Sequence, residues 1–168
     1  QFRQIREWLA PMVVDSIDLI DRYLREDKMV LFEGAQANML DINYGTYPFV
    51  TSSSPTSAGV CEGAGVAPQK LDRIIGIVKA YASRVGEGPF ITEQLNEIGD
   101  SLREKGAEYG ATTGRPRRTG WLDLPVVKQA VRINGITDIA ITKIDILTGY
   151  DQIPVCIGYD IDGEVIDY

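Results

Sequence analysis

The sequence contains no histidine, only two cysteines and no hydrophobic run long enough to cross a membrane. Without histidine, this chain alone cannot form a histidine-activated serine nucleophile. Cys61 and Cys156 lie far apart, so neither a disulfide framework nor a Cys/His metal cluster is expected. The first residues show no signal-peptide pattern, and we therefore expect a cytoplasmic protein without a membrane partner.

Phosphate-binding fingerprints are also missing. The chain has neither a G-x-x-x-x-G-K-[ST] loop nor a G-x-G-x-x-G turn. Gly59, Gly63 and Gly65 are loosely spaced and lack the accompanying lysine. The net charge of -7 argues against nucleic acid as the main partner. Such a chain can bind ligands, but it lacks an obvious means of phosphoryl transfer by itself.

The length of 168 residues suits one domain or a part of a larger one, and alternating helices and strands predict the α/β class. Because the chain begins with Gln1 and ends abruptly at Tyr168, we expect a portion of a longer protein. The patterns predict helices over residues 2–26 (broken at Pro11), 71–78, 92–106 and 123–135, strands at 29–32, 81–85 and 138–143, and a hairpin over 153–168 turning at Asp162-Gly163. Residues 37–68 show no lasting period, and an irregular segment of this length is usually functional.

Local signals refine two of these helices. In the first, Val13, Ile17, Ile20 and Leu24 are predicted to form one apolar stripe. Thr92 is the predicted cap of the helix that carries Leu95, Ile98 and Leu102 and ends at Gly106. Asp123 and Pro125 are expected to open the last helix, and Gly135 to end it.

Residues 110–119 form the most informative stretch, because three arginines lie within four positions next to two threonines and a glycine. Arginine carries a permanent charge on a planar fork of donors that matches carboxylates and phosphates. Thr112 and Thr113 add hydroxyl donors, and Gly114 lets the backbone approach a ligand closely. The pattern indicates a loop that holds small anions; the alternative is a solvated basic turn.

Polar residues at two other places could contact a nucleotide. Gln36 follows the predicted strand at 29–32, and its amide offers donors and an acceptor that suit a base edge. The run Thr51–Ser54 supplies hydroxyls that could bind a phosphate without charge. Each also has a simpler interpretation, a hydrated glutamine for the first and a solvated turn for the second.

The sequence Thr142–Asp145 points to guanine. A carboxylate just beyond a strand can accept hydrogen bonds from N1–H and the 2-amino group of guanine, a donor pair that adenine lacks. The methylene stem of Lys143 can lie across the base plane. The T-K-x-D pattern is short, and a chance match is the alternative.

Taken together, these stretches resemble the adenylosuccinate synthetase family. Two blocks are highly specific to it, D-x-x-x-G-T-Y-P-x-V-T-S-S beginning at Asp41 and T-T-G-R-x-R-R beginning at Thr112. The matching blocks follow one another in order from Val30 to about Tyr168; they are Phe32–Gln36, Leu40–Ser53, Arg84–Phe90, Glu108–Asp123 and Val131–Asp145. Ser54–Glu62 is less typical of the family.

The resemblance implies roles for individual residues toward IMP. Gln36, the catalytic residue within this chain, would hydrogen-bond the 6-oxo edge of IMP, where a transferred phosphoryl creates a leaving group. Thr51 would hold the IMP phosphate, and Val85 and Gly86 would line the nucleotide near its ribose and base. Arg115 would touch the ribose.

The resemblance also implies the sites for aspartate and GTP. Thr113 and Arg115 would meet the carboxylates of aspartate, and Arg117 would also reach GTP. The full aspartate-binding set would be Ala111, Thr112, Thr113, Gly114, Arg115, Pro116 and Arg117. The guanine base would be held by Lys143, Ile144 and Asp145.

At the level of the whole protein, the resemblance implies a P-loop NTPase-related α/β fold with a central mixed sheet and flanking helices. Residues 1–168 would form the central to C-terminal part of a single domain, without its N-terminal phosphate loop, its acid and base, or its extreme C-terminus. The family ligates IMP and L-aspartate at the expense of GTP, uses Mg²⁺ bound outside this chain, and forms homodimers. We expect Arg115, Asp145 and Gln36 to face one shared cavity.

Two alternatives remain open from the sequence. The chain could be a non-catalytic purine-nucleotide-binding fragment, because the acid, the base and the phosphate loop are missing. It could also belong to a sister synthetase acting on another purine nucleotide, such as the phage relatives that use dGMP.

Overall fold

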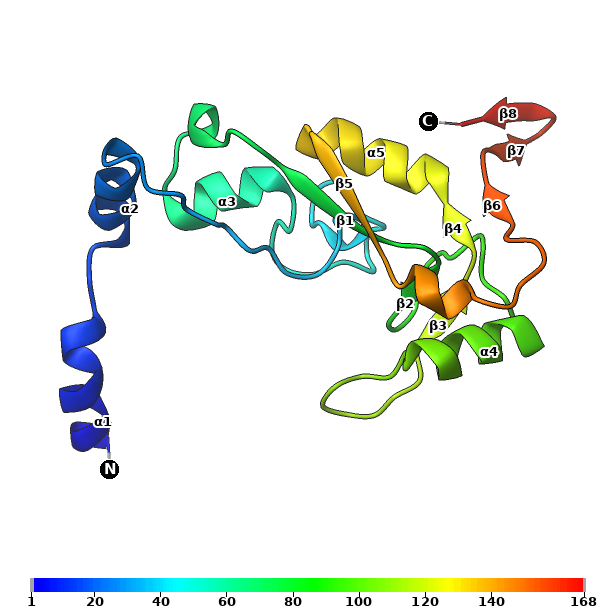
Figure 1. The fold of residues 1–168 in the computed structure, drawn as a ribbon, viewed down its shortest axis with the longest axis horizontal. Helices are drawn as coiled ribbons and strands as arrows, with labels where there is room; N and C mark the ends of the chain where they lie inside the picture. The colour runs from blue at the N-terminus through cyan, green and yellow to red at the C-terminus, as the bar shows by residue number, and fades with distance from the viewer. Residues whose placement is uncertain (1, 168) are drawn as a thin grey trace.

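The computed structural model describes residues 2–167, and its helices alternate with short strands along the chain (Figure 1). The α-helices are α1 (Phe2–Leu9), α2 (Ser16–Arg25), α3 (Ser57–Ala64), α4 (Glu97–Gly106) and α5 (Leu124–Asn134). Short 3-10 turns complete the helical part: η1 (Ala10–Met12), η2 (Asn38–Leu40), η3 (Pro68–Lys70) and η4 (Ile144–Leu147).

The strands pair in both directions, which confirms the mixed α/β class. They are β1 (Ile75–Lys79), β2 (Ala82–Arg84), β3 (Arg118–Gly120), β4 (Leu122–Asp123), β5 (Asp138–Thr142), β6 (Val155–Cys156), β7 (Tyr159–Ile161) and β8 (Glu164–Ile166). Within residues 2–167 they form four two-stranded sheets, parallel for β1–β5 and β4–β6 and antiparallel for β2–β3 and β7–β8.

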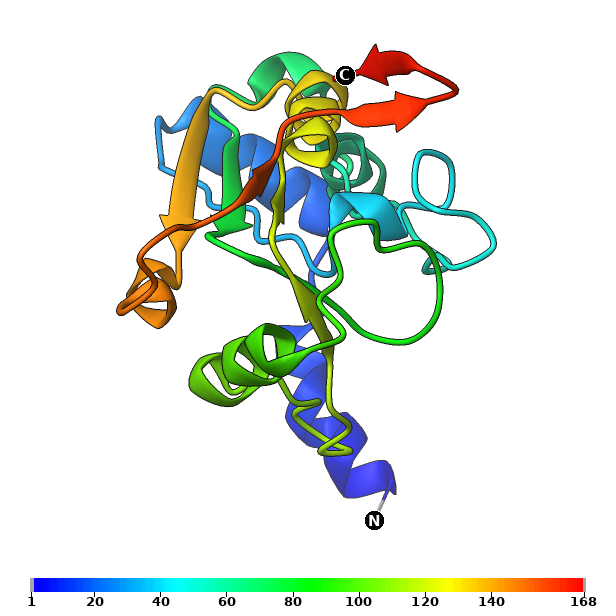
Figure 2. The same cartoon turned by 90° about the vertical axis from the view of Figure 1, so that its right-hand side faces the viewer.

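The parallel pair β1–β5 sets one side of the candidate site. Its register runs from Ile75 opposite Asp138 to Lys79 opposite Thr142, and Figure 2 shows the two strands side by side. The Ala80 amide then donates to the Thr142 carbonyl at 2.9 Å, so the segments that follow β1 and β5 begin at the same end of the pair. In parallel sheets ligands usually bind at the carboxyl ends of the strands, and Lys143 follows directly there.

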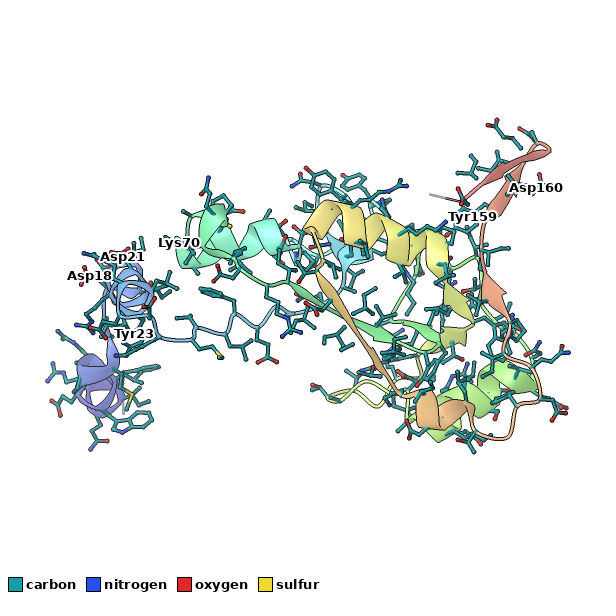
Figure 3. All side chains as sticks on the ribbon, turned by 45° about the horizontal axis from the view of Figure 1, so that its top comes forward. Asp18, Asp21, Tyr23, Lys70, Tyr159 and Asp160 are labelled. Atoms are coloured by element: carbon teal, nitrogen blue, oxygen red, sulfur yellow. The ribbon has the colours of Figure 1, made fainter. Side chains whose placement is uncertain are left out.

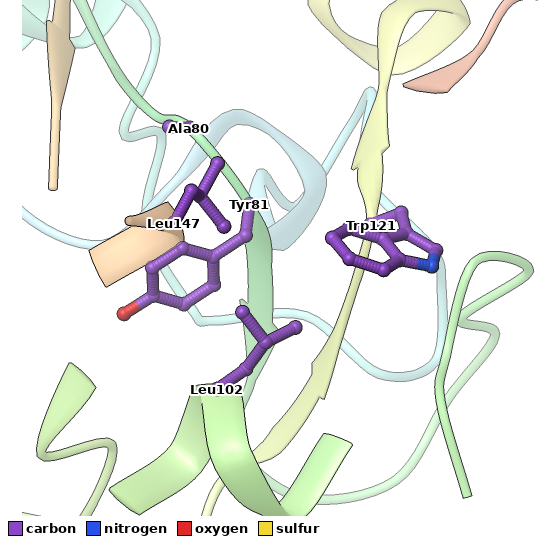
Figure 4. Packing of buried hydrophobic residues seen from close by; sticks show 5 residues of the cluster. All are labelled: Ala80, Tyr81, Leu102, Trp121 and Leu147. Atoms are coloured by element: carbon purple, nitrogen blue, oxygen red, sulfur yellow. The ribbon is translucent and has the colours of Figure 1, made fainter. Parts of the chain in front are cut away.

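The buried core lies beside that strand end. Ala80, Tyr81, Leu102, Trp121 and Leu147 form one cluster, in which Tyr81 lies near Leu102 and Leu147 (Figure 4). Trp121 and Tyr150 meet edge to face with ring centroids 5.7 Å apart. Because aromatic pairs in this geometry are favourable, the core fixes η4 and α4 against the turn that follows β1.

The caps confirm one helix prediction and correct another. The Asp123 carboxylate accepts from the Val126 amide at 3.3 Å and Gly135 ends α5 with a φ of 61°, as predicted. The cap of α4 is Asn96, whose side chain accepts from the amides of Ile98 and Gly99, and not Thr92. Leu95 therefore precedes the helix and is exposed.

Two other predictions are wrong. Residues 71–78 are not a helix, since β1 begins at Ile75; pairing with β5 overrides the local helical pattern. A Cβ on Gly76 would come within 2.7 Å of Ile136, so the strand packs closely at this residue. Residues 29–32 form no strand, because no segment among residues 2–167 pairs with them, and Met29 and Leu31 are exposed.

The long irregular segment contains a helix that the sequence pattern missed. Thr56 precedes α3, and Gly65 ends it with a left-handed φ of 67°. Two glycines and several small residues weaken the apolar period here, which explains the omission. The strand predicted at 138–143 is present as β5, but Ile139 and Ile141 are exposed, so it is not the buried strand expected.

The two ends of the chain lie far apart. Helices α1 and α2 stand away from the strands at the N-terminal end, with a break after Pro11 as predicted (Figure 1). Val13 lies between the helices and Ile17 is exposed, so the predicted stripe does not form one buried face. The labelled side chains of α2 (Asp18, Asp21, Tyr23) and of β7 (Tyr159, Asp160) lie at opposite ends (Figure 3).

The C-terminal hairpin is confirmed. Strands β7 and β8 pair around Asp162 and Gly163, both of which have positive φ. Tyr168, at the end of the predicted hairpin segment, lies outside the described residues. Among residues 2–167, no helix is both long and apolar enough to span a bilayer.

Candidate functional site: two anion-binding loops joined by buried charges

The arginine-rich loop is open to solvent. Residues 111–116 are all exposed, whereas the following residues, from Arg117 to Gly120, become progressively buried as they enter β3. A narrow neck holds the loop: Tyr109 and Pro116 form a bridge, and the Gly110 amide donates to the Arg115 carbonyl at 2.9 Å. The Thr113 hydroxyl accepts from the Arg115 amide, and Gly114 has a left-handed φ of 64°. The predicted aspartate-binding residues are therefore displayed on one tethered turn.

Glu108 lies at the base of this loop and forms an ion pair with Arg117. The side chain is 1% exposed, and its Oε2 accepts from Arg117 Nη1 at 2.9 Å. Its Oε1 accepts from Lys79 Nζ and from the Tyr81 hydroxyl, both at 2.6 Å. Burial by itself raises the pKa of Glu108, but hydrogen bonds from Lys79, Tyr81 and Arg117 outweigh it and lower the pKa to about 2. The carboxylate is therefore ionised at neutral pH.

The same carboxylate is close to the predicted guanine reader. Lys143 Nζ lies 4.0 Å from Glu108 Oε1 and donates to the Gly106 carbonyl. Lys143 itself has a left-handed φ of 56°, directly after β5, and Asp145 and Ile144 follow it on exposed positions of η4. Burial, the bond to Glu108 and the negative charge of Asp145 all raise the pKa of Tyr81. The structure thus brings Arg117, Lys143 and Asp145 to one region.

A buried aspartate organises the segment that carries Thr51. Asp41 is fully buried, and it accepts from the amides of Asn43 and Tyr44 and from the Ser54 hydroxyl, the last at 2.6 Å. Burial raises the pKa of Asp41, yet these hydrogen bonds outweigh it, so the pKa is lowered. The Thr51 amide donates to the Leu40 carbonyl at 2.8 Å. Thr51 is consequently held next to the turn that follows Gln36.

Arg84 ties the Thr51 segment to the turn at Val85 and Gly86. Its Nη2 donates to Thr46 Oγ1 at 2.9 Å and to the Phe49 carbonyl at 3.2 Å. Its Nε donates to the Glu87 carbonyl at 2.9 Å. The predicted IMP residues Thr51, Val85 and Gly86 are therefore carried by segments that one guanidinium joins.

Arg118 secures the same turn from the other strand. It donates to the carbonyls of Gly86 and Gly88 and forms an ion pair with Glu93 at 2.5 Å. Because Arg84 and Arg118 are register partners in the β2–β3 pair, the Gly86 turn and the arginine-rich loop lie at one antiparallel ribbon. The predicted IMP and aspartate segments are thus adjacent in the fold.

Gln36 lies in an exposed turn. It is exposed and has a left-handed φ of 63°, a conformation that non-glycine residues adopt sparingly and often at functional sites. It precedes the turn η2, whose Leu40 carbonyl accepts from Thr51. A single cavity shared by Gln36, Arg115 and Asp145 stays a prediction. A hollow at the N-terminal end is lined by Phe2, Ile5 and Leu9 of α1 and by Val13, and none of the predicted binding residues borders it.

Sequence reasoning missed the residues that hold this arrangement, namely Glu108, Arg84 and Asp41. Each lies inside or beside a motif, but nothing local shows that its partners come from segments between 9 and 38 residues away. The available local signal was their position, since Asp41 and Glu108 each open a matching motif or directly follow a helical segment and Arg84 ends β2. Among residues 2–167, no three His, Cys, Asp or Glu side chains are placed to hold a metal.

The arrangement brings permanent positive charge, hydroxyl groups and one exposed carboxylate to the same part of the described chain. Arg117 keeps one buried donor, Nε, without a hydrogen-bond partner within residues 2–167. A buried unpaired donor is costly, so a ligand that reached it would gain more than an ordinary surface contact. The exposed loop, the arginine beneath it and the carboxylate of Asp145 suit a charged substrate beside a purine base.

Comparison with known proteins shows a consistent likeness. The sequence profile of the family described as adenylosuccinate synthetase matches residues 1–168. The adenylosuccinate synthetase of Halothermothrix orenii is 56% identical over 167 residues, which cover 99% of this chain and 39% of that protein. The chain therefore spans about two fifths of the length of the curated relatives that it matches.

Solved structures agree with this likeness. The fully ligated adenylosuccinate synthetase of Plasmodium falciparum is 47% identical, with a TM-score of 0.94 over 98% of this chain and 39% of its own. The succinoaminodeoxyadenylate synthetase of cyanophage S-2L, bound to dGMP and to dATP as an energy donor, is 22% identical. Its TM-score is 0.63 over 77% of this chain and 39% of its own, which shows a shared fold alone.

Proposed function

The chain belongs to the adenylosuccinate synthetase family, and we propose that it supplies a large part of the site in which GTP drives the joining of IMP to L-aspartate. The products are adenylosuccinate, GDP and phosphate. The γ-phosphoryl of GTP passes to the 6-oxygen of IMP, and the amine of aspartate then displaces that phosphate from C6. The observation that carries the proposal is the placement of the arginine-rich loop and the Lys143–Asp145 turn around one buried carboxylate.

The aspartate site is assigned to the exposed loop. Thr113 and Arg115 would bind the two carboxylates of aspartate, with Ala111, Thr112, Gly114 and Pro116 shaping the turn. Arginine suits this role because each charge-assisted hydrogen bond contributes about 1.5–3 kcal/mol. Exposure of residues 111–116 supports the proposal, since the donors are not already used inside the protein.

The guanine site is assigned to Lys143, Ile144 and Asp145. The Asp145 carboxylate would accept from N1–H and the 2-amino group of guanine, while the Lys143 stem would cover the base. Adenine presents a different edge and would leave the carboxylate unpaired, which is the physical basis for a preference for GTP over ATP. Arg117, held by Glu108 at the base of the loop, would extend toward the phosphates of GTP.

The IMP site is assigned to Gln36, Thr51, Val85, Gly86 and Arg115. Support comes from Arg84, which joins the Thr51 segment to the Gly86 turn. In this arrangement Gln36 would hydrogen-bond the 6-oxo edge, where charge develops as the oxygen is phosphorylated. Rate acceleration would then come from positioning and fixed positive charge, as is general for phosphoryl transfer.

Magnesium and a second subunit belong to the same proposal. Mg²⁺ bound with GTP neutralises phosphate charge, but residues 2–167 provide no cluster of ligands for it, so no residue described here is assigned to it. We also propose a homodimer located in the cytoplasm, as the family resemblance implies. The family resemblance places the catalytic acid and base in a part of the domain outside this chain, and the absence of histidine agrees with this for a histidine acid.

The test uses the product of the complete gene with IMP, aspartate, GTP and magnesium. We expect adenylosuccinate, seen by its ultraviolet absorbance, together with phosphate release, and we expect ATP to replace GTP poorly. Binding of guanine nucleotides without turnover would instead support a non-catalytic module. Turnover with dGMP in place of IMP would support the sister synthetase. Either result would contradict the proposal.

A further inference from the structure

Three cationic side chains surround the buried carboxylate of Glu108. Arg117 and Lys79 bond to opposite oxygens, at 2.9 and 2.6 Å, and Lys143 Nζ stands 4.0 Å away. Arg117 and Lys143 have long side chains, which adopt many rotamers when no partner holds them. Both belong to the proposed ligand-binding set, one in the aspartate loop and one in the guanine turn.

The backbone around Glu108 reinforces this connection. The Glu108 carbonyl accepts from the Arg117 amide at 2.9 Å, which closes the loop that bears the aspartate residues. Lys143 donates to the Gly106 carbonyl at the end of α4, two residues before Glu108. The Glu108 amide is itself held by the Arg103 carbonyl at 2.9 Å. Backbone hydrogen bonds therefore join Glu108 both to α4 and to the loop, and its side chain faces Arg117 and Lys143.

We propose that Glu108 is a positioning residue that couples the aspartate loop to the guanine turn by holding Arg117 and Lys143 at a fixed separation. The inference rests on the proposed function but goes beyond it, because Glu108 is not among the residues assigned to IMP, aspartate or GTP. The cations offset the free-energy cost of burying the Glu108 carboxylate only while they remain in place, since an unpaired buried carboxylate is strongly unfavourable. Movement of either cation toward a ligand is therefore transmitted to the other.

The IMP segments provide an internal control. They are joined by Arg84 through Thr46, Phe49 and Glu87, and none of these residues contacts Glu108. Loss of the Glu108 charge should accordingly affect aspartate and GTP more than IMP, because Arg115 is the one proposed IMP residue on the loop that Glu108 closes. A general loosening of the fold would affect all three substrates alike.

The experiment compares Glu108→Gln with Tyr81→Phe in the product of the complete gene. Glu108→Gln keeps the size of the side chain but removes its charge. Tyr81→Phe is the matched control, because it removes one hydrogen bond to Glu108 Oε1 and leaves every cation in place. For each protein, kcat and the three KM values are measured, together with GDP affinity by calorimetry and thermal stability.

We expect Glu108→Gln to raise the KM values for aspartate and GTP, each by about tenfold, because Arg117 loses a charge-assisted hydrogen bond and Lys143 loses a negative charge 4.0 Å away. GDP affinity should fall by a similar factor, and the KM for IMP should stay within about twofold. Tyr81→Phe should lower thermal stability while leaving all three KM values near those of the unaltered protein. If Glu108→Gln does not fold, Glu108→Asp takes its place, with the same selectivity and a smaller rise.

Three results would overturn the inference: no rise in either KM, a rise for only one of aspartate and GTP, or an equal rise for all three substrates. The same holds if Tyr81→Phe reproduces the Glu108→Gln pattern. These failures are distinct from failure of the proposed function, which would appear as absence of adenylosuccinate formation by the unaltered protein.

Discussion

At the scale of single residues, the candidate site depends on charged side chains that the fold buries or half-buries at the base of exposed loops. Asp41 and Glu108 are almost completely buried, and each is fully hydrogen-bonded. Buried charges persist only with such partners, because desolvation is costly. Many of the proposed ligand-binding residues, by contrast, are exposed, among them residues 111–116 and Asp145, whereas Thr51, Arg117 and Lys143 are half-buried.

Asp145 is the residue whose substitution should change nucleotide choice. Asp145→Asn replaces an acceptor by an amide, so guanine loses one of its two hydrogen bonds and meets a donor instead. We expect the KM for GTP to rise roughly 10- to 100-fold, on the basis of about 1.5–3 kcal/mol per charged hydrogen bond. Initial rates with GTP, ATP and xanthosine triphosphate measure this.

The matching control is Asp151→Asn, an exposed carboxylate on the following loop, which should leave the KM for GTP unchanged. An Asp145→Asn protein with unaltered preference for GTP over ATP would show that the guanine edge is recognised elsewhere.

Arg115 should control aspartate binding. Arg115→Lys keeps the charge but loses the planar fork that can engage a carboxylate through two parallel bonds. The KM for aspartate is expected to rise about tenfold or more, with little change in the KM for GTP. Steady-state kinetics at saturating IMP provide the measurement, and Arg3→Lys, on exposed α1, serves as the control. An aspartate KM that stays constant would remove Arg115 from the aspartate site.

The low pKa of Glu108 predicts that the free energy of unfolding falls at acidic pH. Its pKa is about 2 in the folded protein and 4.5 for an ordinary glutamate, so the folded state holds the proton less tightly. The resulting stabilisation is fully present above pH 4.5 and is lost as the pH falls toward 2. Denaturant unfolding across this interval should show a weaker pH dependence for Glu108→Gln than for the unaltered protein. Parallel curves for the two proteins would mean that Glu108 does not carry this titration.

At the scale of elements, local signals predicted helix ends better than they predicted pairing. Asp123 and Gly135 bound α5 as expected, because a cap and a left-handed stop act within a few residues. The helix predicted at 71–78 is wrong because Leu71, Ile74 and Val78 have the spacing of a helical stripe. Its structure is decided by β5, about sixty residues later in the chain, and this partner is invisible in a local window.

The site shows the same division. The segments 110–119 and 142–145 were found from residue type and spacing, since arginine clusters and T-K-x-D are local. Glu108 was missed because its contacts form only when Lys79 of β1, Arg117 before β3 and Lys143 after β5 come together. Gln36 was tied to a strand that the structure does not contain, so its assignment rests on the family resemblance and its left-handed backbone.

The corrected cap of α4 gives a stability prediction. Asn96→Ala should destabilise the protein by about 1 kcal/mol, because the amides of Ile98 and Gly99 lose their acceptor. Thr92→Val should be nearly neutral, since the buried Thr92 hydroxyl has no hydrogen-bond partner among residues 2–167. Urea unfolding of both variants measures the difference. A larger loss for Thr92→Val than for Asn96→Ala would restore Thr92 as the cap.

At the scale of the whole molecule, the chain presents two loop systems on one framework. The β2–β3 ribbon connects the proposed IMP segments to the arginine-rich loop, and the proposed guanine turn follows the end of the β1–β5 pair. Helices α1 and α2 stand apart from both (Figure 1). The chain spans about two fifths of its curated relatives, so the proposed reaction belongs to the product of the complete gene.

The stoichiometry of a quenched reaction tests the central claim most directly. The complete gene product is mixed with IMP, aspartate, GTP and magnesium, and all nucleotides are quantified by chromatography at several times. We predict that one adenylosuccinate, one GDP and one phosphate appear for each IMP and GTP consumed, and that omitting aspartate stops adenylosuccinate formation. Consumption of GTP without adenylosuccinate in the complete mixture, or adenylosuccinate formed equally well with ATP, would contradict the account.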